Sequence, residues 1–220
     1  MKKRAIPPKQ IRTERRYLTP DEARTFLDAV RGERLEALFT VALAIGLRQG
    51  EALGLRWEDV DLDAGIVQTR VQLQRIDGKL QLVDLKSESS HRTIALPAVA
   101  LNALREHRER QRDERTTFGA AWEDHGLVFT TELGRPLDAQ NVAKQLRRIR
   151  EKAGLPWLNF HGLRHGFGSL LAAQGVHPRV AMELLGHSQI SLTMEIYTHV
   201  APELAREAAG KIDEILAAKP

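Results

Sequence analysis

The chain has 220 residues, enough for one large domain or two small ones with a buried core. Its composition, 42% hydrophobic and 28% charged, is that of an ordinary globular protein, and no apolar run approaches the roughly 18 residues that a membrane span requires. The absence of cysteine excludes disulfides, thiolate metal sites and thiol nucleophiles, and it fits a reducing cytoplasm.

The net charge of +4 is concentrated at the N-terminus. Residues 1–16 contain seven Lys or Arg residues and one Glu, a net charge of +6, so the remaining 204 residues sum to −2. A basic segment suits nucleic acid, and it is equally typical of a solvated linker. Because this segment contains Pro7 and Pro8 and almost no apolar periodicity, we interpret it as an extended arm, and particular residues must indicate the function.

The first predicted helix lies in residues 18–30. Thr19 is a good N-cap, Pro20 suits the first helical position, and Glu22 completes a capping box. The next two segments predict a buried apolar helix and then a short helix that ends in an acidic turn: residues 34–46 and residues 46–65.

The hydrophobic period then changes from that of a helix to that of a strand. Residues 66–75 and 80–85 alternate between apolar and polar side chains, and an Asp-Gly turn signal lies between them, which predicts a β-hairpin. Residues 91–96 predict a third strand. A small antiparallel sheet is therefore expected early in the chain.

The rest of the chain is predicted to be helical, apart from a short extended piece at 126–131. Asp138 is the expected cap of one of these helices and Gly154 its expected stop. The predicted helices are residues 98–115, 138–154, 161–175, 178–186, 188–200 and 202–218. We therefore expect a mainly α fold with a small antiparallel β-sheet, in the α+β class.

The segment HGLRHGFG places His161, Arg164 and His165 on one face of a helix turn, because they lie at positions i, i+3 and i+4. Two histidines at this spacing suit zinc, but the glutamate of H-E-x-x-H is absent and Arg164 would lie beside the cation, so we expect no metal. The alternatives are a buried histidine at a polar helix start, or an anion site in which Arg164 binds phosphate and an imidazole moves a proton.

Two more basic residues lie in informative places. Arg48 follows the apolar helix directly and is drawn toward the interior, where a buried arginine needs an anion; Glu51 would orient it. The simpler alternative is a local Arg48–Glu51 ion pair. Lys86 lies in a polar turn after the hairpin, either solvated there or able to protonate a leaving oxygen, and Lys79 on the same hairpin competes for that role.

Four motifs in order resemble the catalytic domain of the tyrosine site-specific recombinases, the phage integrase family, from about Arg16 onward. They are GLRQGEALGLRWEDVDL, LKSESSHRTIAL, HGLRHGFGSLLAAQG and LLGHSQISLTMEIYTHV. The resemblance implies the catalytic-domain fold of that family, with cleavage and rejoining of double-stranded DNA for site-specific recombination. It implies a cytoplasmic, DNA-associated enzyme that needs no cofactor, neither ATP nor a metal ion.

The resemblance also implies a role for individual residues. Tyr197, one of two tyrosines, matches the nucleophile that forms a 3′-phosphotyrosine and frees a 5′-hydroxyl. Arg48 and Arg164 match the arginines that neutralise the phosphate, and we expect them to favour the phenolate of Tyr197. Lys86 matches the general acid. The further matches are His161, which would accept the tyrosine's proton, His187 as a second active-site histidine, and Glu51 and His165 as supporting residues.

By the same resemblance, residues 1–16 are a basic linker or arm and residues 17–220 the catalytic domain. Family members usually carry an N-terminal core-binding domain as well, so we expect an excised catalytic domain rather than a natural short form such as the fimbrial-inversion recombinases. Gly166 stands where the family more often has threonine.

The last predicted helix has an apolar stripe that needs a partner: Leu204, Ala208, Ile212, Ile215 and Leu216. In the family this segment often docks onto a neighbouring protomer, which implies a homotetramer on DNA. The alternative is that it folds back onto its own domain. Without DNA we expect mostly monomer.

Basic residues of the helix at 138–154, namely Lys144, Arg147 and Arg148, are candidates for phosphate contacts, with a solvated helix face as the alternative. Two other functions share parts of the pattern. A type IB topoisomerase uses the same residue types but religates the same strand. A DNA-inversion regulator or other binding-only DNA protein would tolerate the loss of Tyr197.

Overall fold

The computed structural model describes residues 16–198, together with residues 212 and 216. The predicted basic arm thus lies outside the described residues except for Arg16, and so does most of the last predicted helix. Of its apolar stripe the structure describes Ile212 and Leu216, and both side chains are exposed. Within the described part of the chain, no helix combines the length and the apolar character needed to cross a membrane.

The first three helices are α1 (Pro20–Val30), α2 (Glu36–Ile45) and α3 (Gln49–Leu53). The predicted capping box of α1 is confirmed, since Thr19 Oγ1 accepts from the Glu22 N–H and the Glu22 carboxylate accepts from the Thr19 N–H. α2 is buried along almost its whole length, which explains its apolar sequence. It ends at Gly46 in the left-handed region, with φ at 66°.

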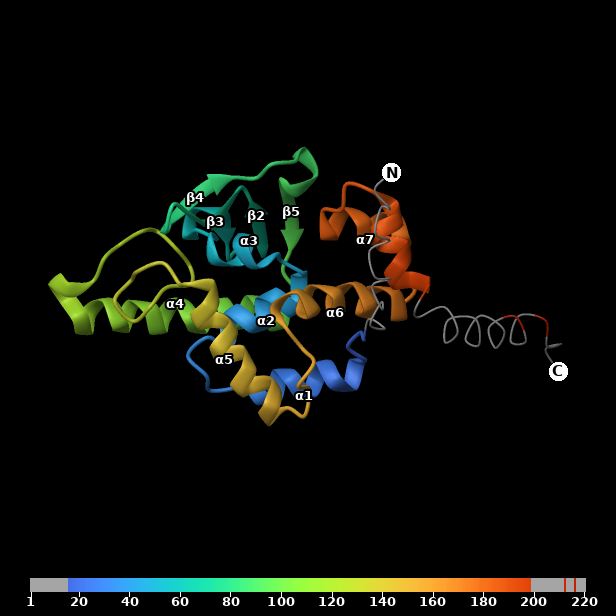
Figure 1. The fold of residues 1–220 in the computed structure, drawn as a ribbon, viewed down its shortest axis with the longest axis horizontal. Coiled ribbons are helices and arrows are strands. Elements are labelled where there is room, and N and C mark those ends of the chain that lie inside the picture. Colours follow the sequence, from blue (N-terminus) through green and yellow to red (C-terminus); the bar gives the residue numbers. More distant parts are fainter. Residues whose placement is uncertain (1–15, 199–211, 213–215, 217–220) are drawn as a thin grey trace, which may run out of the picture.

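Within the described chain, five short strands form two separate antiparallel sheets, which lie above α2 in the view of Figure 1. The first sheet has β2 between β1 and β5, and the second is the β3–β4 hairpin, which turns at Asp77 and Gly78. The strands are β1 (Val60–Asp61), β2 (Ile66–Thr69), β3 (Val71–Ile76), β4 (Lys79–Asp84) and β5 (Arg92–Ala95).

The segment 66–75, expected as one strand, divides at Arg70, and the third predicted strand pairs with β2 rather than with the hairpin. The division has a packing cause, because β3 leaves the first sheet to lie against α3. Gly54 permits that approach: a Cβ there would lie 2.7 Å from the backbone nitrogen of Leu73. The strand β1 also forms inside what was expected to be an acidic turn.

The later helices are α4 (Ala98–Phe118), α5 (Ala139–Lys152), α6 (Phe160–Ala173), α7 (Pro178–Leu185) and a helix through residues 190–198. Asp138 caps α5 by accepting a hydrogen bond of 2.7 Å from the Gln140 N–H, and Gly154 follows the helix with φ at 70°, as predicted. α2 packs between α4 and α6 in the centre of the fold, and α7 contacts both α6 and β5 (Figure 1). The mainly α fold with small antiparallel sheet structure is thus confirmed.

Candidate active site

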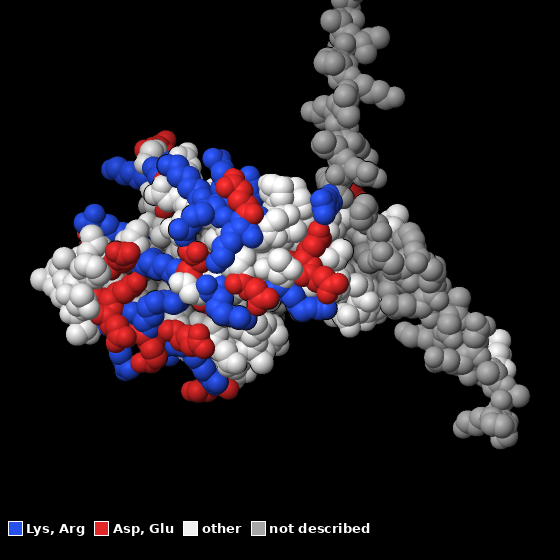
Figure 2. Space-filling view, turned by 90° about the horizontal axis from the view of Figure 1, so that it is seen from below, with Lys and Arg blue, Asp and Glu red and all other residues white. Residues whose placement is uncertain are grey.

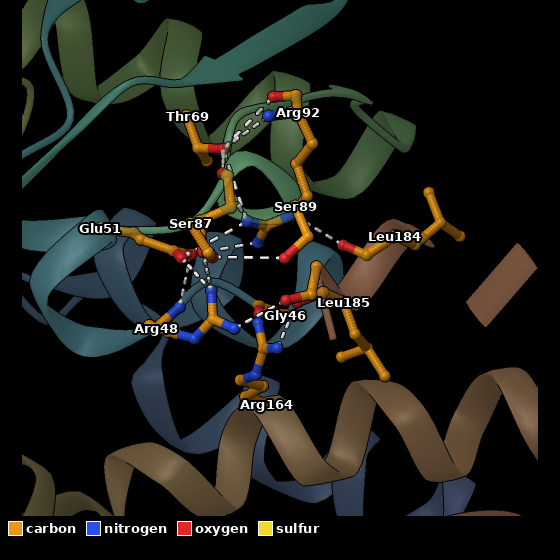
Figure 3. A network of polar contacts seen from close by, with 12 residues as sticks. Gly46, Arg48, Glu51, Thr69, Ser87, Ser89, Arg92, Arg164, Leu184 and Leu185 are labelled. Carbon is orange, nitrogen blue, oxygen red and sulfur yellow. Dashed lines mark hydrogen bonds and ion pairs between the residues drawn. The ribbon is translucent and has the colours of Figure 1, made fainter. Parts of the chain in front are cut away.

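Arg48 stands at the N-terminal end of α3, where the chain leaves the buried helix α2. Its Nη1 donates to Glu51 Oε1 over 2.6 Å and to Ser90 Oγ over 3.2 Å, while Nη2 donates to the Gly186 carbonyl over 2.7 Å. The local ion pair with Glu51 therefore exists, and the same guanidinium also joins two segments far away in the sequence (Figure 3). The Arg48 side chain is 38% exposed, so it is reachable from solvent.

Glu51 is a buried carboxylate between two arginines. It accepts from the backbone N–H of Arg48 over 3.0 Å and from Nη2 of Arg92, in β5, over 3.1 Å. Burial by itself raises the pKa of Glu51, but Arg92 and then Arg48 outweigh it, and the pKa lies below its ordinary value. The group is therefore an anion at neutral pH, and both of its oxygens accept hydrogen bonds from Arg48.

Arg92 was missed by the sequence reasoning. It lies in the motif LKSESSHRTIAL, where one charged residue at the start of a predicted strand does not stand out. Its carboxylate partner lies 41 residues earlier in the chain, and no local pattern connects the two.

Arg164, on α6, is only 3% exposed. Its Nη1 donates to the Gly46 carbonyl over 2.7 Å, and its Nη2 donates to the Leu185 carbonyl. Both carbonyls lie at C-terminal helix ends, where backbone oxygens lack an intrahelical partner. Burial, followed by the charge of Arg48, lowers the pKa of Arg164 to about 9, so it remains a cation at neutral pH. The two arginines thus meet at the consecutive carbonyls of Leu185 and Gly186 (Figure 3).

His187 directly follows this turn. Its Nδ1 lies 2.9 Å from the hydroxyl oxygen of Thr193, which is completely buried. Burial, and then the charges of Arg164 and Arg48, lower the pKa of His187 to about 4, so the imidazole is neutral at pH 7. When the Thr193 hydroxyl donates to Nδ1, the proton resides on Nε2, which is then a donor. Thr193 was not singled out from the sequence.

Tyr197 lies on the helix through residues 190–198 and is 8% exposed. Its ring packs with Ala172 and Ala181, and its hydroxyl donates to the carbonyl of Val176 between α6 and α7. Burial raises the pKa of Tyr197. The expectation that the two arginines favour its phenolate is thus wrong for this arrangement, because desolvation in an apolar setting favours the neutral phenol.

His161 and His165 face each other one turn apart on α6, with ring centroids 4.2 Å apart in an edge-to-face arrangement. His165 also contacts the ring of Tyr17 at 5.9 Å. The described residues contain no group of three His, Cys, Asp or Glu side chains placed to hold a metal ion.

Lys86 is exposed in the connection between β4 and β5. The following residues tie this connection to the arginines, since Ser87 Oγ lies 2.7 Å from Ser90 Oγ, which in turn accepts from Arg48. Lys79 is the first residue of β4, at the turn of the hairpin, and about 20 Å of extended chain separates it from Lys86. The connection that carries Lys86 is thus bound to Arg48 through Ser90, whereas Lys79 lies at the other end of β4.

The basic residues of α5 belong to a different region. Lys144, Arg147 and Arg148 are exposed, on the face opposite the buried stripe of the helix. Arg148 forms an ion pair with Glu33, whereas the described residues provide no such partner for the other two. Figure 2 views the molecule from the side of α1 and α5 and shows Lys and Arg side chains gathered in a band, with Asp and Glu side chains between and below them.

Residues 16–203 match the model of the phage integrase family. The chain is 36% identical, over 225 residues, to a tyrosine recombinase XerC-like protein of Caldanaerobacter subterraneus subsp. tengcongensis, covering 95% of this chain and 56% of that protein. It is 33% identical, over 223 residues, to an integrase of Streptomyces ambofaciens, covering 98% of this chain and 57% of that one.

Two solved structures are similar in fold. The Tn1549 transposon integrase in complex with transposon right end DNA has a TM-score of 0.76 at 23% identity, covering 94% of this chain and 68% of that chain. The XerH site-specific recombinase bound to difH substrate, in a pre-cleavage complex, has a TM-score of 0.62 at 26% identity, covering 86% and 51%. The chain spans little more than half the length of the curated relatives it matches.

Proposed function

This chain belongs to the phage integrase family, and on that premise we propose that it cleaves and rejoins DNA as a tyrosine recombinase in site-specific recombination. The observation that carries the proposal is the meeting of Arg48 and Arg164 at one turn, directly before His187. That turn concentrates positive charge beside a neutral imidazole, as an anionic phosphoryl transition state requires. The division into a basic arm, residues 1–16, and a catalytic domain, residues 17–220, is part of the proposal.

In the first step the Tyr197 oxygen attacks the scissile phosphorus. The bond between phosphorus and the 5′-oxygen of the following nucleotide breaks, which leaves a 3′-phosphotyrosine and a free 5′-hydroxyl. His161 accepts the phenolic proton, and Lys86 protonates the leaving 5′-oxygen. In the second step a 5′-hydroxyl of a partner strand attacks the phosphotyrosine and restores the tyrosine. Because each step exchanges one phosphoester for another, the cycle needs neither ATP nor a metal ion.

The surrounding groups stabilise charge as it develops on the non-bridging oxygens. Arg48 is partly exposed and can turn donors toward the phosphate, whereas Arg164 is buried and acts through a medium of low polarity, where its charge is felt more strongly. His187 contributes a neutral Nε2–H donor. Before the attack, Tyr197 must exchange its hydrogen bond to Val176 for the phosphate.

The proposed partner is double-stranded DNA carrying a recombination site, and the proposed place of action is the cytoplasm, on that DNA. Two of the similar structures are complexes of a transposon integrase and of XerH with their DNA. The exposed residues Lys144, Arg147 and Arg148 of α5 would contact phosphates. Assembly on DNA would be a homotetramer linked through the segment that follows residue 198.

A trapping experiment tests the proposal. The protein is mixed, in EDTA and without ATP, with nicked suicide duplexes tiled across the DNA that flanks its coding sequence. We expect a band on a denaturing gel whose peptide mass places the DNA on Tyr197. Tyr197→Phe should form no adduct, and Tyr17→Phe, which changes the other described tyrosine, should retain it. Binding of a duplex without any adduct would favour a binding-only protein, and adducts that religate only their own strand would favour a topoisomerase.

A further inference from the structure

Arg92 is a buried guanidinium at the start of β5 that joins three segments of the proposed site. Its side chain is 8% exposed. Nε donates to the Leu184 carbonyl over 2.9 Å, Nη2 to Glu51 Oε2 over 3.1 Å, and Nη1 to the Ser90 carbonyl over 3.2 Å (Figure 3). These partners lie on α7, on α3 and on the connection that carries Lys86.

The C-terminal end of α7 collects three arginines in sequence. The carbonyl of Leu184 accepts from Arg92, that of Leu185 from Arg164, and that of Gly186 from Arg48. The C-terminal end of a helix attracts cations, because its last carbonyls lack intrahelical partners and carry the negative end of the dipole. The turn that leads into His187 is therefore held by all three guanidiniums.

Arg92 also packs tightly against this turn. Gly186 has φ at 60°, and a Cβ there would lie 3.0 Å from Arg92 Nη1 and 2.7 Å from the carbonyl oxygen of Ser89. The turn has no room to move toward β5 without displacing Arg92. The position of His187 thus depends on where Arg92 stands.

The second connection runs through the carboxylate of Glu51. Arg92 reaches both of its oxygens, with Nη1 3.4 Å from Oε1 and Nη2 3.1 Å from Oε2, while Arg48 donates to the same carboxylate. A buried carboxylate needs such partners to remain ionised and in place. The planar guanidinium of Arg92, with several N–H donors, defines the orientation of the Glu51 carboxylate better than a lysine ammonium would.

We propose that Arg92 is a positioning residue of the DNA-cleavage site, which sets Arg48 through Glu51 and sets the turn before His187 through the Leu184 carbonyl. The inference rests on the function proposed above. Arg92 itself does not touch the phosphate, because its side chain is buried behind Glu51 and the α7 turn. Its loss should therefore slow the chemical step and leave DNA binding intact.

The test compares Arg92→Gln and Arg92→Lys with the wild-type chain and with a matched control, Arg34→Gln. Arg34 performs the same kind of structural task elsewhere, since it donates to both oxygens of Glu114 over 2.9 and 2.8 Å and to the Thr130 carbonyl over 2.7 Å. The rate of adduct formation is measured in single turnover on the nicked duplex that the wild type cleaves, with saturating protein. The dissociation constant for the same duplex is measured in parallel.

We expect Arg92→Gln to form the adduct about 10- to 100-fold more slowly, the cost of a misplaced catalytic group, at unchanged DNA affinity. Arg92→Lys should recover part of the rate, and Arg34→Gln should match the wild type. When the rate of adduct formation is measured against pH, its fall on the acid side should begin at a higher pH in Arg92→Gln than in the wild type. The reason is that a Glu51 carboxylate without Arg92 takes up a proton more readily. The double variant Arg92→Gln/Glu51→Gln should be no slower than Glu51→Gln alone.

A wild-type rate and an unshifted pH profile in Arg92→Gln would overturn the positioning role while leaving the proposed function standing. Rate losses that multiply in the double variant would overturn the route through Glu51. If Arg92→Gln does not fold, the rate and pH profile of Arg92→Lys decide instead, and a wild-type result there overturns the role. A wild-type protein that binds the duplex but forms no adduct would refute the proposed function itself, which is a distinct result.

Discussion

The hydroxyl of Tyr197 donates a hydrogen bond to the backbone carbonyl of Val176, in the connection between α6 and α7. The ring packs against Ala172 of α6 and Ala181 of α7, so the proposed nucleophile belongs to this helix layer. The arginines, in contrast, are bound to the turn that follows α7. In the proposed reaction the tyrosine must therefore leave one set of partners to reach the other.

This burial predicts a particular loss of stability at alkaline pH. Burial raises the pKa of Tyr197, so the folded state favours the neutral phenol. A tyrosine in the unfolded chain ionises near pH 10. The stability that comes from keeping Tyr197 as a buried neutral phenol is therefore complete below that pH, and it is lost as the pH rises through the folded-state pKa. From about pH 9 to about pH 11, the wild type should lose more free energy of unfolding in urea than Tyr197→Phe. Tyr17 is present in both proteins, and equal losses would contradict the prediction.

Thr193 is fully buried, and we expect its hydroxyl to affect the rate of adduct formation through His187. Because the pKa of His187 is lowered to about 4, its tautomer at neutral pH is selected by the hydrogen bond to the Thr193 hydroxyl. Thr193→Val keeps the shape and removes that bond. Adduct formation should slow by about 10-fold, less than the roughly 100-fold typical of deleting a transition-state donor.

Thr198→Val is the matched control for that change. Among the described residues, the Thr198 hydroxyl donates only to the Met194 carbonyl, one turn earlier in the same helix. It should leave the rate unchanged. Equal rates for Thr193→Val and the wild type would show that His187 does not need this hydroxyl. The ¹⁵N shifts of the His187 ring at pH 7 would report the tautomer directly.

Gly54 should be intolerant of a side chain for a purely steric reason. A Cβ there would meet backbone atoms of β3, 2.7 Å from Leu73 N and 2.8 Å from Gln72 C, and backbone cannot rotate away. Gly54→Ala should lower the free energy of unfolding by about 1–3 kcal/mol, as overpacking does. Gly50→Ala is the control, since its nearest contact would be 3.2 Å; similar urea midpoints for the two variants would refute the argument.

Electrostatic contacts of α5 with DNA would appear in the salt dependence of binding. Each phosphate contact adds about 0.9 to the slope of log K against log salt. Lys144→Ala and Arg147→Ala should each reduce the slope by about that amount. Arg148→Ala should change it less, because that guanidinium already pairs with Glu33. Slopes unchanged in all three variants would indicate a solvated helix face.

The features that the sequence predicted well depend on near neighbours. The capping box of Thr19 and Glu22 and the Asp138 cap form between residues two or three positions apart. The turn at Asp77 and Gly78 likewise follows from the local preference for positive φ. Such contacts exist wherever the segment folds, so a linear pattern is enough to reveal them.

The division of residues 66–75 into two sheets could not be read in the same way. Both halves alternate correctly for a strand, and the alternation says nothing about which neighbour each half will pair with. The second half separates from the first sheet because it packs, as β3, against α3, and Gly54 leaves room for that contact. One of the two partners of β2 is β5, which follows the hairpin in the chain.

For the site, the sequence by itself determined the family and which side chains are proposed to react, because Arg48, Arg164, His187 and Tyr197 stand in ordered motifs. The tertiary structure decided what each of them touches. Arg48 meets a carbonyl 138 residues away, Arg92 meets Glu51 across 41 residues, and Tyr197 is bound to Val176. Contacts of that range depend on how whole helices pack. Burial among those helices also shifts the pKa of Tyr197 upward and, together with the charges of Arg164 and Arg48, the pKa of His187 downward.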